Sequence, residues 1–226
     1  MFWVTRMGTA VHGTTVRILP AVTLLAVLAA CGVMQTPPPA ITERISDQFA
    51  PSHLIYCFGH GCAQQHTVAF PPDEWNAVRA LFAEAPADAA AERQRIRVAI
   101  GLLEGFAGAQ AGTSGDRGRT MPFGYTLGPA QLDCYDETIN TSNFIGLLER
   151  DGLLRYHREG APVQRTLIDG DIIHATAVVA ETATGRRFAV DSSYFDNGVA
   201  ASVAPVEDWL SGWKPPEIVA AEAADN

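Results

Sequence analysis

The sequence predicts an α+β fold in which N-terminal helices pack on an antiparallel sheet. Two patterns carry this prediction. Between residues 71 and 150, apolar side chains recur at the spacing of amphipathic helices, and between residues 153 and 194 they form β-branched or alternating runs separated by glycines. The domain is expected to span residues 51–213, which is long enough to bury one sizeable hydrophobic core.

Three helices are expected in the first half of this domain. The first begins at Pro71-Pro72-Asp73-Glu74, where proline and acidic residues suit the first turn. The second spans about residues 89–110, and we expect it to bury a stripe of aliphatic side chains: Ile96, Ile100, Leu103 and Ala107. The third begins near Asp133, a good N-cap residue, and ends at about Arg150 before Gly152.

Strands are expected after the third helix, at residues 153–157, 163–168, 172–180 and 187–194. Thr182 to Gly185 is the expected turn between the last two strands, so antiparallel partners should have residue numbers that sum to about 367. The numbers of His174 and Asp191 sum to 365. The two residues are therefore expected to be near neighbours on one face of the sheet.

The first thirty residues have the pattern of an export signal. Arg6 and Arg17 form a positively charged region before a largely apolar run from Ile18 to Leu28, which is shorter than the roughly 20 residues of a membrane span. The sequence Leu28-Ala29-Ala30-Cys31 resembles the lipobox of bacterial lipoproteins. This resemblance implies that residues 1–30 are a lipoprotein signal peptide and that Cys31 is lipid-modified; an ordinary signal peptide cut nearby is the alternative.

The segments that flank the domain are expected to be simple. Residues 31–50 contain Thr36-Pro37-Pro38-Pro39 and are expected to form an extended tether that holds the domain off a membrane. By resemblance, Gly32 after the cysteine favours the outer membrane, with the domain facing the periplasm. Residues 214–226 are expected to be a frayed acidic tail, and Trp209 and Trp213 to pack the preceding segment onto the domain.

The charge of the chain restricts its partners. Residues 1–30 contain two of the 16 basic residues and none of the 25 acidic residues, so the remaining chain has a formal charge of −11. This charge argues against nucleic acid and against electrostatic binding to anionic lipid, because both reward basic patches. Membrane contact is therefore expected through the lipid anchor alone. No cofactor is expected.

The other cysteines divide into a pair and a single thiol. In an oxidising compartment, Cys57 and Cys62 are expected to form a disulfide, because the glycines between them let a short loop close. The alternative is a zinc site made by these cysteines with His60 and His66, but the close spacing suits a disulfide better, so no metal is expected. Cys134 is left unpaired, which calls for an explanation such as reactivity or burial.

Cys134 has the surroundings of a candidate nucleophile. With Asp133 as the N-cap, Cys134 lies in the first helical turn, where free N–H groups and the helix dipole favour a thiolate and should lower the thiol pKa. Those N–H groups could also hold an oxyanion. Asp136 and Glu137 oppose the effect on the pKa. His174 could take the thiol proton and Asp191 could orient the imidazole. The structural alternative is a small buried side chain.

Three short motifs resemble the transglutaminase-like core, and most closely the bacterial transglutaminase-like cysteine proteinases. They are Leu132-Asp133-Cys134-Tyr135-Asp136 at a helix start, then His174-Ala175, then Phe188-Ala189-Val190-Asp191. The likeness covers roughly residues 120–200. It implies a papain-like fold in which Cys134, His174 and Asp191 form the catalytic triad.

The chain departs from this family at one position. The family usually has a glycine two residues before the cysteine, and here that residue is Leu132. Gln131 and Tyr125 are candidates for the upstream donor that would stabilise an oxyanion. The glycine position shapes the approach to the nucleophile, so Leu132 bears on whether the site is active.

These observations predict an envelope-anchored cysteine hydrolase or acyl transferase. Its substrate is expected to be an amide or ester, such as a peptide or a cell-envelope amide. The competing prediction is a catalytically inactive envelope lipoprotein that uses the same fold as a binding or assembly module, and Leu132 is the residue that favours it.

Overall fold

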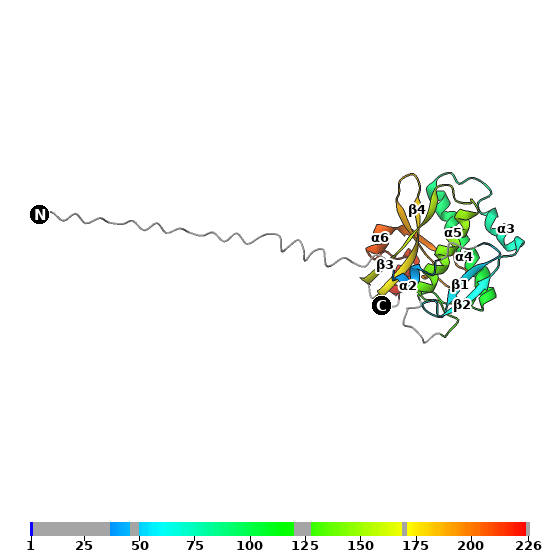
Figure 1. Ribbon diagram of the computed structural model, residues 1–226, viewed down its shortest axis with the longest axis horizontal. Coiled ribbons are helices and arrows are strands. Elements are labelled where there is room, and N and C mark those ends of the chain that lie inside the picture. The colour runs from blue at the N-terminus through cyan, green and yellow to red at the C-terminus, as the bar shows by residue number, and fades with distance from the viewer. Residues whose placement is uncertain (2–36, 46–49, 120–127, 169–170, 225–226) are drawn as a thin grey trace. The chain divides into compact units, whose positions relative to one another are not determined.

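The computed structural model describes residue 1 and residues 37–45, 50–119, 128–168 and 171–224 (Figure 1). The expected signal peptide, the expected lipidation site Cys31 and the candidate Tyr125 lie outside these ranges. Residues 33–226 belong to one compact unit. Among the described residues, no helix is both long enough and apolar enough to cross a bilayer.

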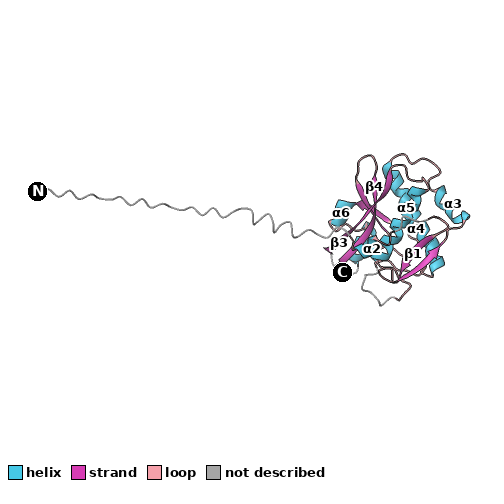
Figure 2. Ribbon diagram, in the orientation of Figure 1, coloured by secondary structure: helices cyan, strands magenta, loops and turns pink. Residues whose placement is uncertain are grey.

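The described part of the chain is α+β, as predicted, and its larger sheet is antiparallel with the order β3-β4-β5-β6. The strands are β3 (His157–Ile168), β4 (Asp171–Glu181), β5 (Arg187–Asp191) and β6 (Ser202–Pro205). Helices α4 (Ala89–Ala111) and α5 (Cys134–Arg150) cover one face of this sheet, and α6 (Val206–Leu210) lies on the other (Figure 2).

The predicted register between β4 and β5 is confirmed. Ala177 pairs with Val190 and Val178 with Ala189, so each pair of residue numbers sums to 367. Alternation then divides the side chains between two cores. Ala177 and Val190 face the main core beside α4 and α5, whereas Val178 and Ala189 face Trp209 of α6. The expected packing role of Trp209 is confirmed as well, because this side chain is fully buried.

The helix boundaries follow the predicted signals. Helix α3 (Pro72–Ala80) begins with proline at its first position, and α4 begins at the N-cap Asp88 and ends at Gly112 in the left-handed conformation. The stripe predicted for α4 is buried: Ile96, Ile100, Leu103 and Ala107. Asp133 is confirmed as the N-cap of α5, because its carboxylate accepts the N–H groups of Tyr135 and Asp136.

Strand β3 is longer than predicted. The sequence predicted two strands separated at Gly160, but one strand runs from His157 to Ile168, with a shift of register between Gly160 and Val163. Glycine suits this position because the strand passes close to the Val178 side chain. A Cβ at residue 160 would lie 2.8 Å from Cγ1 of Val178. Residues 153–156, expected to be strand, form a loop.

A second sheet was not predicted at all. Strands β1 (Leu54–Phe58) and β2 (Gln64–Val68) form an antiparallel hairpin ahead of α3. Strand β1 is apolar and mostly buried, but β2 consists mostly of exposed polar residues and has no apolar alternation. Because β2 lacks this alternation, its sequence does not indicate a strand, and the hairpin was not predicted.

The described residues of both flanking segments include a helix that was not predicted. The expected tether contains helix α2 (Pro39–Thr42), and Ile41 is buried against Cys57, Cys62 and Ile139. Proline can begin this helix because the first helical N–H needs no intrahelical partner. The expected frayed tail contains helix α7 (Pro216–Ala224), in which Glu222 contacts Arg119 and Lys214.

Two glycines of α4 provide a matched test of its packing on the loop after β5. A Cβ at Gly101 would lie 2.7 Å from the backbone of Val199, whereas a Cβ at Gly105 would be 3.7 Å from Gly198. We expect Gly101→Ala to destabilise the protein by about 1–3 kcal/mol. Gly105→Ala should be neutral or stabilising by up to about 1 kcal/mol, because alanine favours helix. Urea denaturation measures both, and equal effects would contradict the close approach at Gly101.

Candidate active site

His174 and Asp191 form a buried hydrogen-bonded pair. The distance from Nε2 of His174 on β4 to Oδ2 of Asp191 at the end of β5 is 2.8 Å. The two side chains are 11% and 2% exposed, respectively. The predicted proximity of these residues on one face of the sheet is therefore confirmed.

Asp191 is held by two further donors. Nε1 of Trp209 donates to Oδ2 at 2.8 Å, and Oγ of Ser193 donates to Oδ1 at 2.7 Å. Burial on its own raises the pKa of Asp191, but His174, Ser193 and Trp209 together hold it below its ordinary value. An ionised Asp191 accepts Nε2–H of His174, so Nδ1 is the ring nitrogen left to act as a base. No described residue hydrogen-bonds Nδ1.

Aromatic rings fix the plane of the His174 imidazole. The ring stacks on Trp209 with a centroid distance of 5.2 Å and an interplanar angle of 27°, and it also contacts Tyr194. Arg165, which pairs with His174 across β3 and β4, supports both rings: its guanidinium lies 4.5 Å from the Trp209 ring and donates to the Tyr194 hydroxyl. The roles of Ser193, Tyr194 and Arg165 were not predicted from the sequence, and for Trp209 only packing was predicted.

Cys134 is the first residue of α5, and the backbone N–H of Ala175 lies close enough to its sulfur to lower the thiol pKa. Ala175 follows His174 directly, so the helix start meets β4 beside the histidine. Asp191 is also close enough to act electrostatically on the thiol. The thiol is 2% exposed. Asp191 thus lies near both His174 and Cys134, and among the described residues no hydrogen bond joins the Cys134 sulfur to the His174 ring.

The expected low pKa of the Cys134 thiol is wrong. Burial, followed by the negative charge of Asp133, raises the thiol pKa well above its ordinary value, and the Ala175 N–H only partly offsets this. The charges of Asp191 and Asp136 raise it further, by smaller amounts. At neutral pH the resting cysteine is a thiol rather than a thiolate.

The residue that departs from the family pattern packs into the protein interior. Leu132 is buried in the main hydrophobic core, and its backbone N–H donates to Oδ1 of Asp116 at 2.7 Å. Gln131, a candidate oxyanion donor, instead holds the loop before it: its amide accepts the N–H of Arg117 and donates to the carbonyl of Gly115.

A second glutamine lies beside the nucleophile and was not anticipated. Gln164 on β3 pairs with Ala175 on β4, and its Oε1 accepts the hydroxyl of Tyr135 at 3.0 Å. Tyr135 is near enough to Cys134 for the sulfur to raise the pKa of the phenol, after the larger effect of burial. Within the described ranges, no hydrogen bond is made by Nε2 of Gln164. The sequence signal for Gln164 was its position as a polar residue in the predicted strand 163–168.

Two buried carboxyl groups support the site from the helix layer. Glu104 of α4 and Glu137 of α5 hydrogen-bond to each other, and Oγ of Ser192, the neighbour of Asp191, donates to Oε2 of Glu137 at 2.7 Å. Burial raises the pKa of Glu104 to about 7 and that of Glu137 well above its ordinary value. Two carboxyl groups in contact share a proton at neutral pH, because both cannot ionise together.

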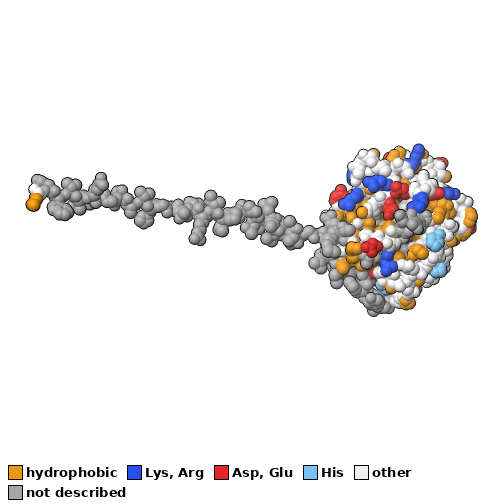
Figure 3. All heavy atoms as spheres, viewed as in Figure 1, with side chains coloured by type: hydrophobic (Ala, Val, Ile, Leu, Met, Phe, Trp, Pro, Cys, Tyr) orange, Lys and Arg blue, Asp and Glu red, His pale blue; other side chains and the backbone are white. Residues whose placement is uncertain are grey.

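The predicted disulfide between Cys57 and Cys62 is confirmed. It uses both sulfurs that the zinc alternative required as thiolates. In the part of the chain that the structure describes, no three His, Cys, Asp or Glu side chains are grouped in a way that could hold a metal ion. Charged side chains of both signs are dispersed over the face of the molecule seen in Figure 3.

Comparison with known proteins does not assign the chain to a family. No family model matches the sequence, and no curated protein or solved structure matches it either. The likeness to transglutaminase-like proteinases therefore rests on the three short motifs alone.

The buried carboxyl groups should make the protein less stable as pH rises. Burial raises the pKa of Glu104, Asp116 and Asp136 to about 7. The unfolded chain releases these protons near pH 4, so between about pH 4 and pH 7 the folded state binds more protons and its stability falls. We expect the free energy of unfolding to be lower at pH 8 than at pH 5 by on the order of a few kcal/mol.

Chemical denaturation at the two pH values measures this difference. Glu104→Gln should reduce the dependence on pH while keeping a hydrogen bond to Glu137, and Glu207→Gln on the exposed side of α6 is the control. Stability that rises from pH 5 to pH 8 would contradict the shared proton.

The charge of Asp133 should slow the reaction of Cys134. Asparagine is as good an N-cap as aspartate, so Asp133→Asn should keep the helix start and remove the charge that raises the thiol pKa. We expect iodoacetamide to modify Cys134 several-fold faster at pH 7.5 in this variant. Asp73→Asn, in the first turn of α3, is the matched control. An unchanged rate would contradict an effect of the Asp133 charge on the thiol pKa.

Proposed function

We propose that the protein is a cysteine hydrolase or acyl transferase that acts on amide or ester bonds through Cys134, His174 and Asp191. The 2.8 Å hydrogen bond between His174 and Asp191 carries this proposal. It commits Nε2 to the carboxylate and leaves Nδ1 as a base. The next residue of the same strand, Ala175, has its N–H close enough to the Cys134 sulfur to lower the thiol pKa.

The reaction begins from a neutral thiol. His174 takes the proton of Cys134 as the sulfur attacks the carbonyl carbon, and Asp191 stabilises the imidazolium that forms. The tetrahedral intermediate collapses to a thioester, and His174 returns the proton to the leaving amine or alcohol. Water or a second amine then attacks the thioester and releases Cys134. Proton transfer accompanies attack because burial and Asp133 disfavour a free thiolate.

Two donors are available for the oxyanion. The backbone N–H of Cys134 lies in the first turn of α5, where helical N–H groups lack intrahelical partners, and no described residue accepts it. The amide of Gln164 is the second, because the Tyr135 hydroxyl holds its oxygen and leaves the nitrogen to donate. We assign these groups the role that was expected of Gln131 or Tyr125.

We further propose that the chain is a lipoprotein of the cell envelope with a transglutaminase-like core. The order of the nucleophile helix and of the strands with His174 and Asp191 supports the core. The Cys57–Cys62 disulfide suits an oxidising compartment such as the periplasm. Cys31 would carry the lipid that holds the domain at the outer membrane, and a peptide or cell-envelope amide would be the substrate.

A binding or assembly module with an inactive site is the second candidate. The observation that favours it is the state of Cys134, whose thiol is buried and has a raised pKa. In this case Cys134 is a small core residue, and the His174–Asp191 pair serves to join β4 to β5.

Acylation of Cys134 by p-nitrophenyl acetate distinguishes the two candidates. We expect a burst of nitrophenolate and acetylation of Cys134 in the intact mass, and no burst in Cys134→Ala. His174→Ala should slow acylation by about 10²–10⁴-fold, because the general base is lost. His66→Ala, on exposed strand β2, should have no effect. Circular dichroism checks that each variant is folded.

Equal rates of acylation in the wild type and in His174→Ala would contradict the catalytic proposal. Absence of any acylation in the folded wild-type protein would do the same. Either result would favour the binding module.

A further inference from the structure

The turn that joins Cys57 to Cys62 has an unusual backbone. Four consecutive residues have left-handed φ values: Gly59 at 80°, His60 at 70°, Gly61 at 65° and Cys62 at 59°. Glycine adopts this conformation freely, but His60 and Cys62 do so at a cost in free energy. Such strain persists only when surrounding contacts impose it. The hydrogen bonds that impose this conformation therefore indicate the role of the turn.

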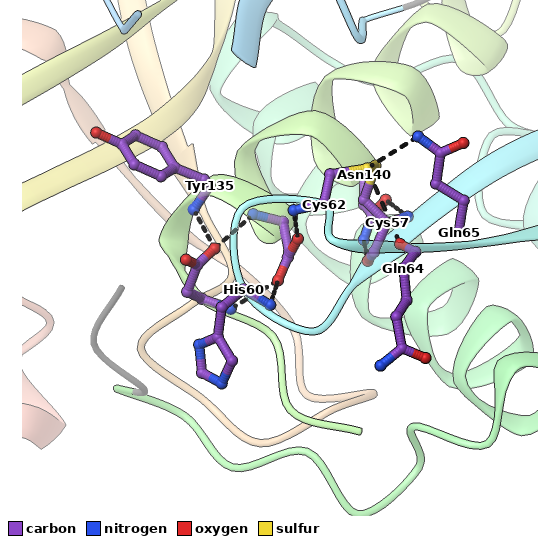
Figure 4. Close-up of a disulfide and its surroundings, with 9 residues drawn as sticks. Cys57, His60, Cys62, Gln64, Gln65, Tyr135 and Asn140 are labelled. Carbon is purple, nitrogen blue, oxygen red and sulfur yellow. Dashed lines mark hydrogen bonds between the residues drawn. A yellow bond between two sulfur atoms is a disulfide. The ribbon is translucent and has the colours of Figure 1, made fainter. Parts of the chain in front are cut away.

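Those contacts converge on the helix that carries Cys134. The N–H groups of His60 and Cys62 donate to the two carboxylate oxygens of Asp136, at 2.8 and 2.5 Å. The Asp136 carboxylate also accepts the N–H of Asp133 at 3.1 Å, as part of the capping box. Figure 4 shows the turn curling over the start of α5.

The disulfide closes the turn from the other side. The sulfurs of Cys57 and Cys62 are bonded, and the side chain of Asn140 on α5 pairs with both the N–H and the carbonyl of Cys57, at 2.7 and 2.8 Å (Figure 4). Ile41 packs over the same disulfide. The first two turns of α5 are thus fastened to the disulfide turn (residues 57–62) at Asp136 and at Asn140.

We propose that Asp136 is a positioning residue for Cys134 and that the Cys57–Cys62 disulfide keeps it in place, which makes the reactivity of Cys134 depend on the redox state of this disulfide. The inference rests on the proposed function, because it concerns the geometry of the same nucleophile. Asp136 does not touch the reacting atoms. It fixes the start of α5, and with it the place of the Cys134 sulfur against the Ala175 N–H.

Opening the disulfide should release this arrangement. A dithiol reductant is oxidised to its own disulfide, and the protein takes up two electrons and two protons to form the thiols of Cys57 and Cys62. His60 and Cys62 can then leave the left-handed region, and their N–H groups leave Asp136. The capping box loses its support, and the first turn of α5, with Cys134, becomes mobile.

Two reactions of Cys134 should respond in opposite directions. Iodoacetamide needs only an accessible thiol, so alkylation should become faster and its pH profile should approach that of an ordinary thiol, at about 8.5. Acylation by p-nitrophenyl acetate needs the sulfur aligned with His174, so it should become slower by about 10-fold or more and lose its dependence on His174.

The variants for this test are Cys57→Ser/Cys62→Ser, which removes the disulfide, and Asp136→Asn, which removes one carboxylate oxygen from the turn. Both should show the two opposite changes. Asp151→Asn is the matched control, because Asp151 lies at the other end of α5 and holds Trp75 and Arg79 instead. It should leave both reactions of Cys134 unchanged even if it lowers stability.

Hydrogen exchange separates this proposal from the proposed function. Removal of the disulfide should reduce protection of residues 59–62 and 134–137 together, while α4 stays protected. If His174→Ala does not slow acylation in the oxidised protein, the proposed function fails, but the exchange and the alkylation profile still test the positioning role. If acylation and alkylation are the same with and without the disulfide, or if Asp151→Asn reproduces the opposite changes, the positioning role is overturned.

Discussion

The rest of the structure depends on how the buried start of α5 satisfies its backbone N–H groups. Asp133 and Asp136 supply acceptors at this helix end, and the strained turn at residues 59–62 completes the shell around Asp136. These carboxylates give the helix a defined beginning and place Cys134 at a fixed depth. They also put negative charge beside the thiol. The same groups that position the nucleophile therefore keep it protonated at rest.

The sheet contributes to the site through the division of its two faces. One face packs on α4 and α5, and the other packs on Trp209, which stacks on the His174 ring and donates to Asp191. A single buried side chain thus joins the second core to the hydrogen bond that orients the imidazole. The orientation of the His174 imidazole consequently depends on the packing of α6.

The sequence predicted those features that depend on local chemistry. Asp133 is a cap because of its side chain, the register of β4 and β5 follows from the turn at Thr182–Gly185, and the disulfide follows from close cysteines separated by glycines. Contacts between distant segments could not be predicted in this way. Ile41 reaches the disulfide, and Glu104 meets Glu137, only because the chain folds back on itself.

The pKa of Cys134 shows the same division between local and distant causes. The position of Cys134 at a helix start can be inferred from the sequence, but burial, which the sequence does not reveal, has the largest effect on the thiol pKa. Similarly, Gly160 signals an interruption in the sequence, whereas in the sheet it lets β3 pass close to Val178. The role of a residue changed wherever packing outweighed its intrinsic preference.

The proton shared by Glu104 and Glu137 changes how the charge of this protein should be read. The formal value of −9 treats every carboxyl group as ionised, but the folded chain retains protons near neutrality that the unfolded chain has released. The native protein is therefore less anionic than its composition states, and its isoelectric point lies above that of the denatured chain. In native electrophoresis it would migrate more slowly toward the anode than size and sequence charge imply, and unfolding at neutral pH would acidify an unbuffered solution.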